Sequence, residues 1–250
     1  MKKILFFICF ICFYVYSFSS DKKRDEVIVT PDVSLIDIPT AGVIDYANFN
    51  LKTRFYNNGG VLTYINAGIL QNITLGASFM IDNLIGSNSP VKMVRPEMQL
   101  KFRFYDGGYY IPALAIGYDG QGYYYDRNIK KYMQKGKGLY LVGSRELFFP
   151  GFMTSAGFNI PDYDDGYLYS FIGFNYNMDD KLNLMIEFDN LFHSDYPSRL
   201  NAGVRINVNS NFFIDVAFRN IGRNDKFPNG WDNKTERIVQ FNTSFYLGNF

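Results

Sequence analysis

The stretch LNAGVRINVN at residues 200–209, followed by FFIDVAFRNI at residues 212–221, decides the fold of this chain. In both stretches apolar residues take every second position, and asparagine, arginine or aspartate stand between most of them. Successive side chains of a β-strand point to opposite faces, so this period of two predicts two strands with one apolar and one polar face. The polar pair Ser210–Asn211 separates them, which indicates a hairpin with a tight turn.

One such hairpin also fits a soluble sheet that is buried on one side, so its repetition along the chain is what matters. From residue 42 onward the alternation returns in about twelve segments of roughly ten residues, the length that a tilted strand needs to cross a bilayer. The predicted strands cover residues 42–56, 61–70, 73–81, 97–104, 109–118, 138–147, 152–160, 167–178, 182–190, 200–209, 212–221 and 237–250. Pro112 lacks an N–H for the ladder, so irregular pairing is expected beside it.

The connections between these strands alternate in length. Five are tight, at residues 71–72, 106–108, 148–151, 179–181 and 210–211. Most of the others are longer and more polar, at residues 83–94, 119–137, 191–199 and 222–236. Short turns at one end and long loops at the other are typical of outer-membrane barrels, whose turns face the periplasm. Only a closed barrel satisfies every backbone group in lipid, so the first and last strands are expected to pair.

The N-terminus has the layout of a secretory signal peptide. Lys2 and Lys3 precede an apolar run at residues 4–16, and small polar residues follow, so cleavage is expected near Ser20. Residues 21–41 are then expected to form a periplasmic linker that leads to a barrel domain at residues 42–250.

Both cysteines, Cys9 and Cys12, lie inside the predicted signal peptide. A lipoprotein is the alternative interpretation, although bulky Ile8 and Ile11 stand where a small residue is wanted. With the signal removed, the chain has no cysteine for a disulfide or a thiolate metal site.

Composition narrows the class of protein further. Twenty-five basic and 24 acidic residues give a net charge of +1, which argues against nucleic acid as a partner. Aromatic residues make up 18% of the chain, and after residue 20 no apolar run approaches the roughly 18 residues of a membrane helix. The fold class is therefore all-β: a single antiparallel up-and-down transmembrane barrel of about twelve strands. A soluble double sheet is the alternative architecture.

The polar faces of the predicted strands carry charged residues that would line the barrel lumen. They can pair with one another and with water to fill the interior, or they can form a polar track for a hydrophilic solute or glycan. The candidate lumen-lining residues are Lys52, Arg54, Glu97, Lys101, Arg103, Glu187, Asp189, Arg205, Asp215 and Arg219.

The sequence holds no convincing catalytic, cofactor or metal site. His193 stands beside Ser194 and Asp195, but a Ser–His–Asp relay needs three groups that converge from separate places. The acidic stretch 162–165 lacks the spacing and the closing Glu of a calcium loop, and Gly136–Lys137 lacks the rest of a phosphate loop. We therefore expect no enzymatic activity and no cofactor.

Several segments resemble the YjbH-like outer-membrane proteins. They are IDIPTA at residues 36–41, MQLKFRF at 98–104, YIPALAIG at 110–117, and the later segments 185–188 and 200–206. The similarity covers most of residues 36–221 and implies an outer-membrane barrel linked to exopolysaccharide production or export. It also implies polysaccharide-export proteins or a glycan as partners.

The sequence thus predicts a barrel in the outer membrane that assists exopolysaccharide export or the passage of polar solutes. Outer-membrane lipids and the outer-membrane assembly machinery are its expected partners. The alternative function is a structural barrel that transports nothing and binds partners through its long external loops.

Overall fold

The structure is a computed structural model that describes residues 32–246, apart from 88–89, 109, 164–165 and 193–196. The expected signal peptide and residues 21–31 of the predicted linker lie outside this part of the chain. No helix among the described residues is long and apolar enough to cross a membrane.

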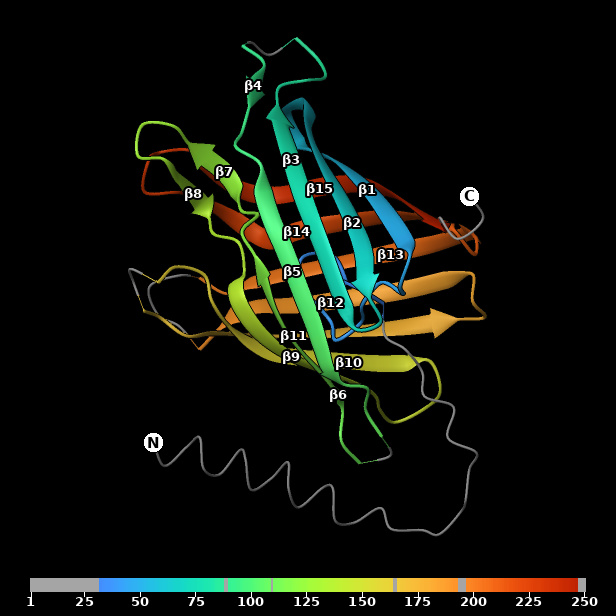
Figure 1. The fold of residues 1–250 in the computed structure, drawn as a ribbon. Coiled ribbons are helices and arrows are strands. Elements are labelled where there is room, and N and C mark those ends of the chain that lie inside the picture. Colours follow the sequence, from blue (N-terminus) through green and yellow to red (C-terminus); the bar gives the residue numbers. More distant parts are fainter. Residues whose placement is uncertain (1–31, 88–89, 109, 164–165, 193–196, 247–250) are drawn as a thin grey trace, which may run out of the picture.

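Twelve long antiparallel strands form a closed barrel (Figure 1). The main sheet has thirteen strands, of which the two-residue strand β4 (Lys92–Met93) only extends one edge of β3. The twelve wall strands are β1 (Asn48–Tyr56), β2 (Gly60–Leu70), β3 (Ile73–Asp82), β5 (Glu97–Tyr105), β6 (Ala113–Asp119), β9 (Gly138–Glu146), β10 (Phe152–Ile160), β11 (Tyr169–Met178), β12 (Leu182–Leu191), β13 (Arg199–Asn209), β14 (Phe212–Lys226) and β15 (Asp232–Tyr246). The predicted fold class is confirmed.

The first and last wall strands close the barrel. Strand β1 pairs with β15 over eight residue positions, from Asn48 opposite Tyr246 to Phe55 opposite Val239. Strand β1 also pairs with β2, and β15 also pairs with β14, so neither strand leaves an edge unpaired. The predicted pairing of the two terminal strands is therefore confirmed, although residues 247–250 lie outside the described part.

Burial along the strands is the reverse of that in a soluble protein. In β12, Leu184, Ile186 and Phe188 are 43%, 42% and 38% exposed, whereas the alternate residues Glu187 and Asp189 are 0% exposed. A wall that turns its leucines outward and its carboxylates inward needs an apolar solvent around it. The alternation seen in the sequence has this physical origin.

The predicted tight turns lie at one end of the barrel and the long connections at the other, where the three-residue turn Asn57–Gly59 between β1 and β2 also lies (Figure 1). Several predicted boundaries differ from the structure, among them those of β6 and of the connection between β14 and β15. Strand β6 begins at Ala113, directly after Pro112, and its partner β5 has a register shift between Arg103 and Tyr105. The predicted loop 222–236 is mostly strand, because β14 and β15 continue to pair as far as Lys226 opposite Asp232.

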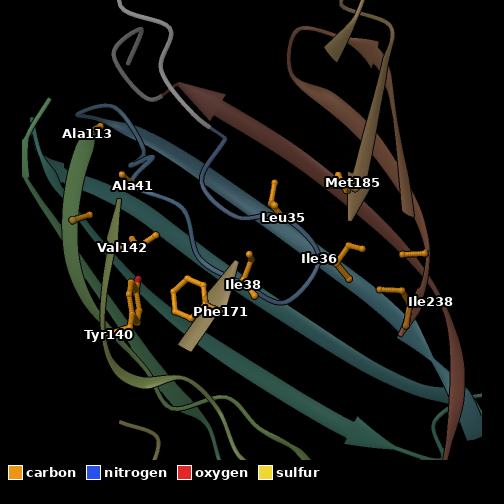
Figure 2. Packing of buried hydrophobic residues seen from close by; sticks show 12 residues of the cluster. Leu35, Ile36, Ile38, Ala41, Ala113, Tyr140, Val142, Phe171, Met185 and Ile238 are labelled. Carbon is orange, nitrogen blue, oxygen red and sulfur yellow. The ribbon is translucent and has the colours of Figure 1, made fainter. Parts of the chain in front are cut away.

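Residues 32–46, here called the re-entrant segment, lie inside the barrel rather than leading up to it. The segment turns back sharply, with an isolated bridge between Ser34 and Pro39 and a 3.1 Å hydrogen bond from the Leu35 N–H to the Ile38 carbonyl. Figure 2 shows Leu35, Ile36 and Ile38 surrounded by wall strands. The sequence predicts a linker through residue 41 and a strand from residue 42. In the structure β1 starts only at Asn48, after Ala47 at a positive φ of 61°.

A hairpin between β6 and β9 also turns toward the lumen. It consists of β7 (Tyr123–Asp126) and β8 (Lys131–Gln134), where the sequence predicts a loop. Tyr123 and Tyr132 of this hairpin are buried in a cluster with Leu62, Tyr64 and Met80 of the wall. The re-entrant segment and the β7–β8 hairpin therefore enter the lumen from opposite ends of the barrel.

Candidate functional site

An ion cluster at the tip of the re-entrant segment marks the centre of the lumen. The Asp37 carboxylate lies 2.7 Å from Nη1 of Arg54 and 2.7 Å from Nε of Arg219. Arg219 also lies 2.5 Å from the carboxylate of Glu236. Arg54 and Arg219 come from β1 and β14, so one aspartate ties the segment to two strands of the wall. Glu236 lies on β15, the strand between them.

The next two strands along the wall, β13 and β12, hold the backbone of the segment. The Glu187 carboxylate on β12 accepts hydrogen bonds from the N–H groups of Asp37 at 2.9 Å and Ile38 at 3.1 Å. Asn201 on β13 donates a further bond to Glu187 at 2.9 Å. These two N–H groups have no ladder partner, so a wall carboxylate satisfies donors that would otherwise be buried without an acceptor.

Lys101 joins the two limbs of the re-entrant segment. Its ammonium group donates to the carbonyl oxygens of Val33 at 2.6 Å, Thr40 at 3.0 Å and Gly42 at 2.9 Å. An ammonium has three donors, and three carbonyls accept from this one. Lys101 of β5 thus adds to the Ser34–Pro39 bridge in holding the two limbs of the segment together.

Two wall glycines make room for the segment. A Cβ atom at Gly173 would lie 2.3 Å from Cδ1 of Ile38 and 2.8 Å from Cδ1 of Leu35. A Cβ atom at Gly68 would lie 2.0 Å from the Asp45 carbonyl oxygen. Any larger residue at either position would overlap the segment, so the wall is shaped around it.

The tight-turn end of the barrel carries a second ion cluster. Arg205 lies 2.8 Å from Asp215 within the wall and 2.8 Å from Asp32, where the described segment begins. Beside them lies a polar recess of about 460 Å³ that Asn207, Asn209 and Phe213 also line. The segment enters the lumen past this recess.

From the long-loop end, the β7–β8 hairpin reaches the same central cluster. The Tyr123 hydroxyl donates to Asp37 at 3.4 Å and contacts Arg54, and the Arg219 guanidinium lies 3.7 Å from the centre of the Tyr123 ring. Gln134 accepts a 3.1 Å hydrogen bond from Arg219. The two inward elements therefore meet on the same pair of arginines, and together they fill the middle of the lumen.

A second tyrosine of the hairpin contacts the wall farther out. The Tyr124 hydroxyl donates to the carboxylate of Glu236. Burial, together with this carboxylate, raises the pKa of the Tyr124 phenol, so the hydroxyl keeps its proton and remains a donor.

Eight of the ten predicted lumen-lining residues are buried, and Lys52 and Arg103 are partly exposed. The eight buried residues are Arg54, Glu97, Lys101, Glu187, Asp189, Arg205, Asp215 and Arg219. Arg54, Lys101, Glu187, Arg205 and Arg219 all contact the re-entrant segment, which brings them into one network.

The remaining predicted residues pair separately. Glu97 accepts from Arg95 and from the Tyr132 hydroxyl at 3.1 Å, and Arg103 lies 2.7 Å from Asp106. Asp189 pairs with Lys137 at 2.5 Å and also with Arg199. These groups belong to the wall, the β7–β8 hairpin or the turns rather than to the central cluster.

Only weak sequence signals exist for the central partners that were not predicted. Asp37 falls in the expected linker, and Tyr123 and Gln134 fall in an expected loop. One available signal is the apolar content of residues 35–38, LIDI, which is unusual for a solvated linker. For Tyr123 and Gln134 the strands are four residues long, too short for the alternation to stand out.

The other sequence motifs form no site in the described residues. No group of three or more His, Cys, Asp or Glu side chains there is placed to hold a metal ion. His193 lies outside that part, as do two residues of the acidic stretch 162–165. Asp162 pairs with Lys135 at 3.2 Å, and the lysine of Gly136–Lys137 pairs with Asp189.

No protein-family model and no curated protein matches this sequence. Among solved structures, the chain is similar to a KdgM porin with 9% sequence identity and a TM-score of 0.51, over 80% of this chain and 99% of that one. The KdgM porin in complex with disordered oligogalacturonate gives a TM-score of 0.52 over the same shares at 9% identity. A NanC porin has 10% identity and a TM-score of 0.42, over 80% of this chain and 100% of that one.

The chain has the fold of a porin barrel. At 9% sequence identity, the similarity to the KdgM porin shows the fold and nothing finer. The charged lumen and its two inward elements are therefore interpreted from this chain's own residues.

Proposed function

We propose that this protein is an outer-membrane barrel that passes polar solutes through a lumen closed by the re-entrant segment and the β7–β8 hairpin. One observation carries the proposal: a porin-type wall has charged residues on its inner face and is occluded by a segment that many polar contacts hold in place. Lipid-facing strands support an outer-membrane location, and the proposed role is passage rather than catalysis.

Displacement of the segment would turn the inner face into a charged pore. Arg54, Lys101, Glu187, Arg205 and Arg219 would then lose their contacts with the segment and face water. Water can replace hydrogen bonds and ion pairs at modest net cost, so these contacts can open in a way that a fully apolar plug could not. The apolar side of the segment, Leu35 and Ile38 against Phe171, opposes opening.

The finer part of the proposal concerns the solute. The resemblance to YjbH-like proteins favours a role in exopolysaccharide export, and a structurally similar porin is described in complex with an oligogalacturonate. Both favour a glycan as the solute. The rows of amide and charged side chains on the wall provide donors and acceptors for sugar hydroxyls.

The test compares the conductance of purified protein in planar bilayers with that of Gly173→Leu. The leucine side chain would overlap the ends of the Ile38 and Leu35 side chains, so it should expel the segment without replacing any residue of the ion clusters. We expect brief, rare openings for the unmodified protein and sustained ion conductance for Gly173→Leu. The matched control is Ala156→Leu on the outer face of β10, which should behave as the unmodified protein.

The competing function is a barrel that never opens and binds partners through its external loops. The filling of the lumen from both ends favours it. Absence of conductance in both the unmodified protein and Gly173→Leu, with both reconstituted as folded barrels, would support this alternative and contradict passage.

A further inference from the structure

A cavity of about 100 Å³ remains beside the re-entrant segment, between it and the inner faces of β1, β2, β3, β5 and β6. One water needs roughly 10–15 Å³ by this measure, so the cavity has room for a small organic molecule. Its lining extends from Thr74, near the tight-turn end, to Lys135, near the long-loop end. It is the space that the two inward elements leave unfilled.

The cavity has more basic than acidic side chains in its lining, five against two. Most of the basic groups have partners: Lys135 pairs with Asp162, Lys137 and Arg199 pair with Asp189, and Lys101 donates to three carbonyl oxygens. Of the two acidic groups, Asp37 already pairs with Arg54 and Arg219. The other, Asp119, accepts hydrogen bonds from the side chain of Gln99 at 3.2 Å and the N–H of Gln121 at 3.0 Å.

Lys52 differs from the other predicted lumen cations in having no anionic partner and no carbonyl cradle. Its ammonium lies 3.4 Å from the Ser34 hydroxyl and 4.2 Å from the centre of the Tyr64 ring. No carboxylate of the described residues lies within 4.0 Å of it. The predicted arginines each have a carboxylate within that distance, and Lys101 has its three carbonyls.

Lys52 is partly exposed and lines the cavity, so an anion that enters the cavity can supply the counter-ion that this ammonium lacks. Polar groups that suit a sugar surround the same space. Oε1 of Gln99 accepts no hydrogen bond from the part of the chain that the structure describes, and the Tyr64 ring offers an aromatic face. Carboxylate recognition by a lysine, hydroxyl recognition by amides and contact with a ring are the elements of a binding site for an acidic sugar.

We propose that this cavity binds a single acidic sugar residue, with its carboxylate on Lys52 and a hydroxyl on Gln99. The proposal rests on the proposed function, because it names the class of polar solute that the lumen takes. The site lies on the wall side of the re-entrant segment, so it exists while the lumen is closed.

The test is isothermal titration calorimetry of the folded barrel in detergent with D-glucuronate and with D-glucose. These two sugars differ only in the carboxylate at C6. We expect glucuronate to bind at least tenfold more tightly than glucose. Lys52→Met should remove this difference, and Lys52→Arg should keep most of it.

Lys181→Met is the matched control, since Lys181 is an exposed lysine on a tight turn. This variant should bind glucuronate as the unmodified protein does. Circular dichroism verifies that each variant keeps its β structure. Equal affinity for the two sugars, or glucuronate binding that survives Lys52→Met, would overturn the proposal. So would equal competition by chloride, which would indicate a site for any small anion.

The two proposals can fail separately. Glucuronate binding by a barrel that never conducts would keep the site and contradict passage. Conductance through Gly173→Leu without any preference for glucuronate would keep passage and overturn the site.

Discussion

Replacement of Asp37 by asparagine should release the re-entrant segment, because Asp37 bridges the two central arginines. The two arginines are affected unequally. Arg219 keeps the carboxylate of Glu236 at 2.5 Å, whereas Arg54 keeps only neutral partners, among them Gln240 at 2.9 Å. The substitution therefore leaves one buried guanidinium without a carboxylate.

The loss of one partner of a buried ion pair costs about 3–5 kcal/mol. We expect the lower end, about 3 kcal/mol, since the asparagine amide oxygen can still accept one hydrogen bond. About 1.4 kcal/mol is a factor of ten, so the undocked fraction of the segment should rise roughly a hundredfold.

The assay labels a cysteine placed at Ile36 with a water-soluble maleimide, because Ile36 is buried at the tip of the segment. Its labelling rate follows the undocked fraction when docking is fast. Asp37→Asn should speed labelling about a hundredfold in this background. Asp45→Asn, which alters an exposed carboxylate on the same segment, should leave the rate unchanged.

A second substitution tests the reasoning about Arg54. When Arg54→Met is combined with Asp37→Asn, no unpaired guanidinium remains at that position, so labelling should be slower than in the single variant. Labelling of Asp37→Asn at the rate of the Asp45→Asn control would refute the role of Asp37. A double variant that labels faster than the single one would refute the account of the unpaired charge.

Other predictions concern the wall and the segment. Val216→Arg should destabilise the barrel by about 2–4 kcal/mol in unfolding from lipid vesicles, because Val216 lies on the outer face, and Val216→Leu should be nearly neutral. Cysteines at Leu51 and Thr243, which face each other across β1 and β15, should form a disulfide on oxidation, whereas a pair offset by about four residues should not. Lys101→Met should weaken docking of the segment by about 1.5–3 kcal/mol, measured as faster maleimide labelling at Ile36→Cys, and unchanged labelling would contradict the carbonyl cradle.

The strands of the wall could be predicted from the sequence because neighbouring residues alternate between lipid, which favours apolar side chains, and the lumen, which favours polar ones. Strand β12 shows this well: Leu184 and Ile186 face lipid, and Glu187 and Asp189 face inward. The same rule assigns ten charged residues to the inner face from the alternation alone. The alternation could not predict which of these side chains contact one another, because contacts across the lumen join strands that are far apart in sequence.

The re-entrant segment could not be predicted because its apolar and polar residues do not alternate with a regular period. Its contacts are hydrogen bonds to Lys101, Ser144 and Glu187, which lie about 60, 100 and 150 residues farther along the chain. Gly173 leaves space in the wall for the segment. A glycine in a strand can also mark a bulge or a bend, so this residue does not by itself predict a segment inside the barrel. Only the resemblance at residues 36–41 singled out this stretch, and a resemblance does not say where a segment lies.

The two inward elements depend on each other at one point. Tyr123 of the β7–β8 hairpin and Asp37 of the re-entrant segment contact each other, and both contact Arg54 and Arg219. When either element leaves, both guanidinium groups lose a partner while they remain in the lumen. Once one element has left, removal of the other therefore costs more free energy, because the same two guanidinium groups lose a further partner. An anion from solution that binds the arginines would lower this cost. A lumen built this way is held closed by its own arginines, and an anionic solute is the kind of molecule that can compete for them.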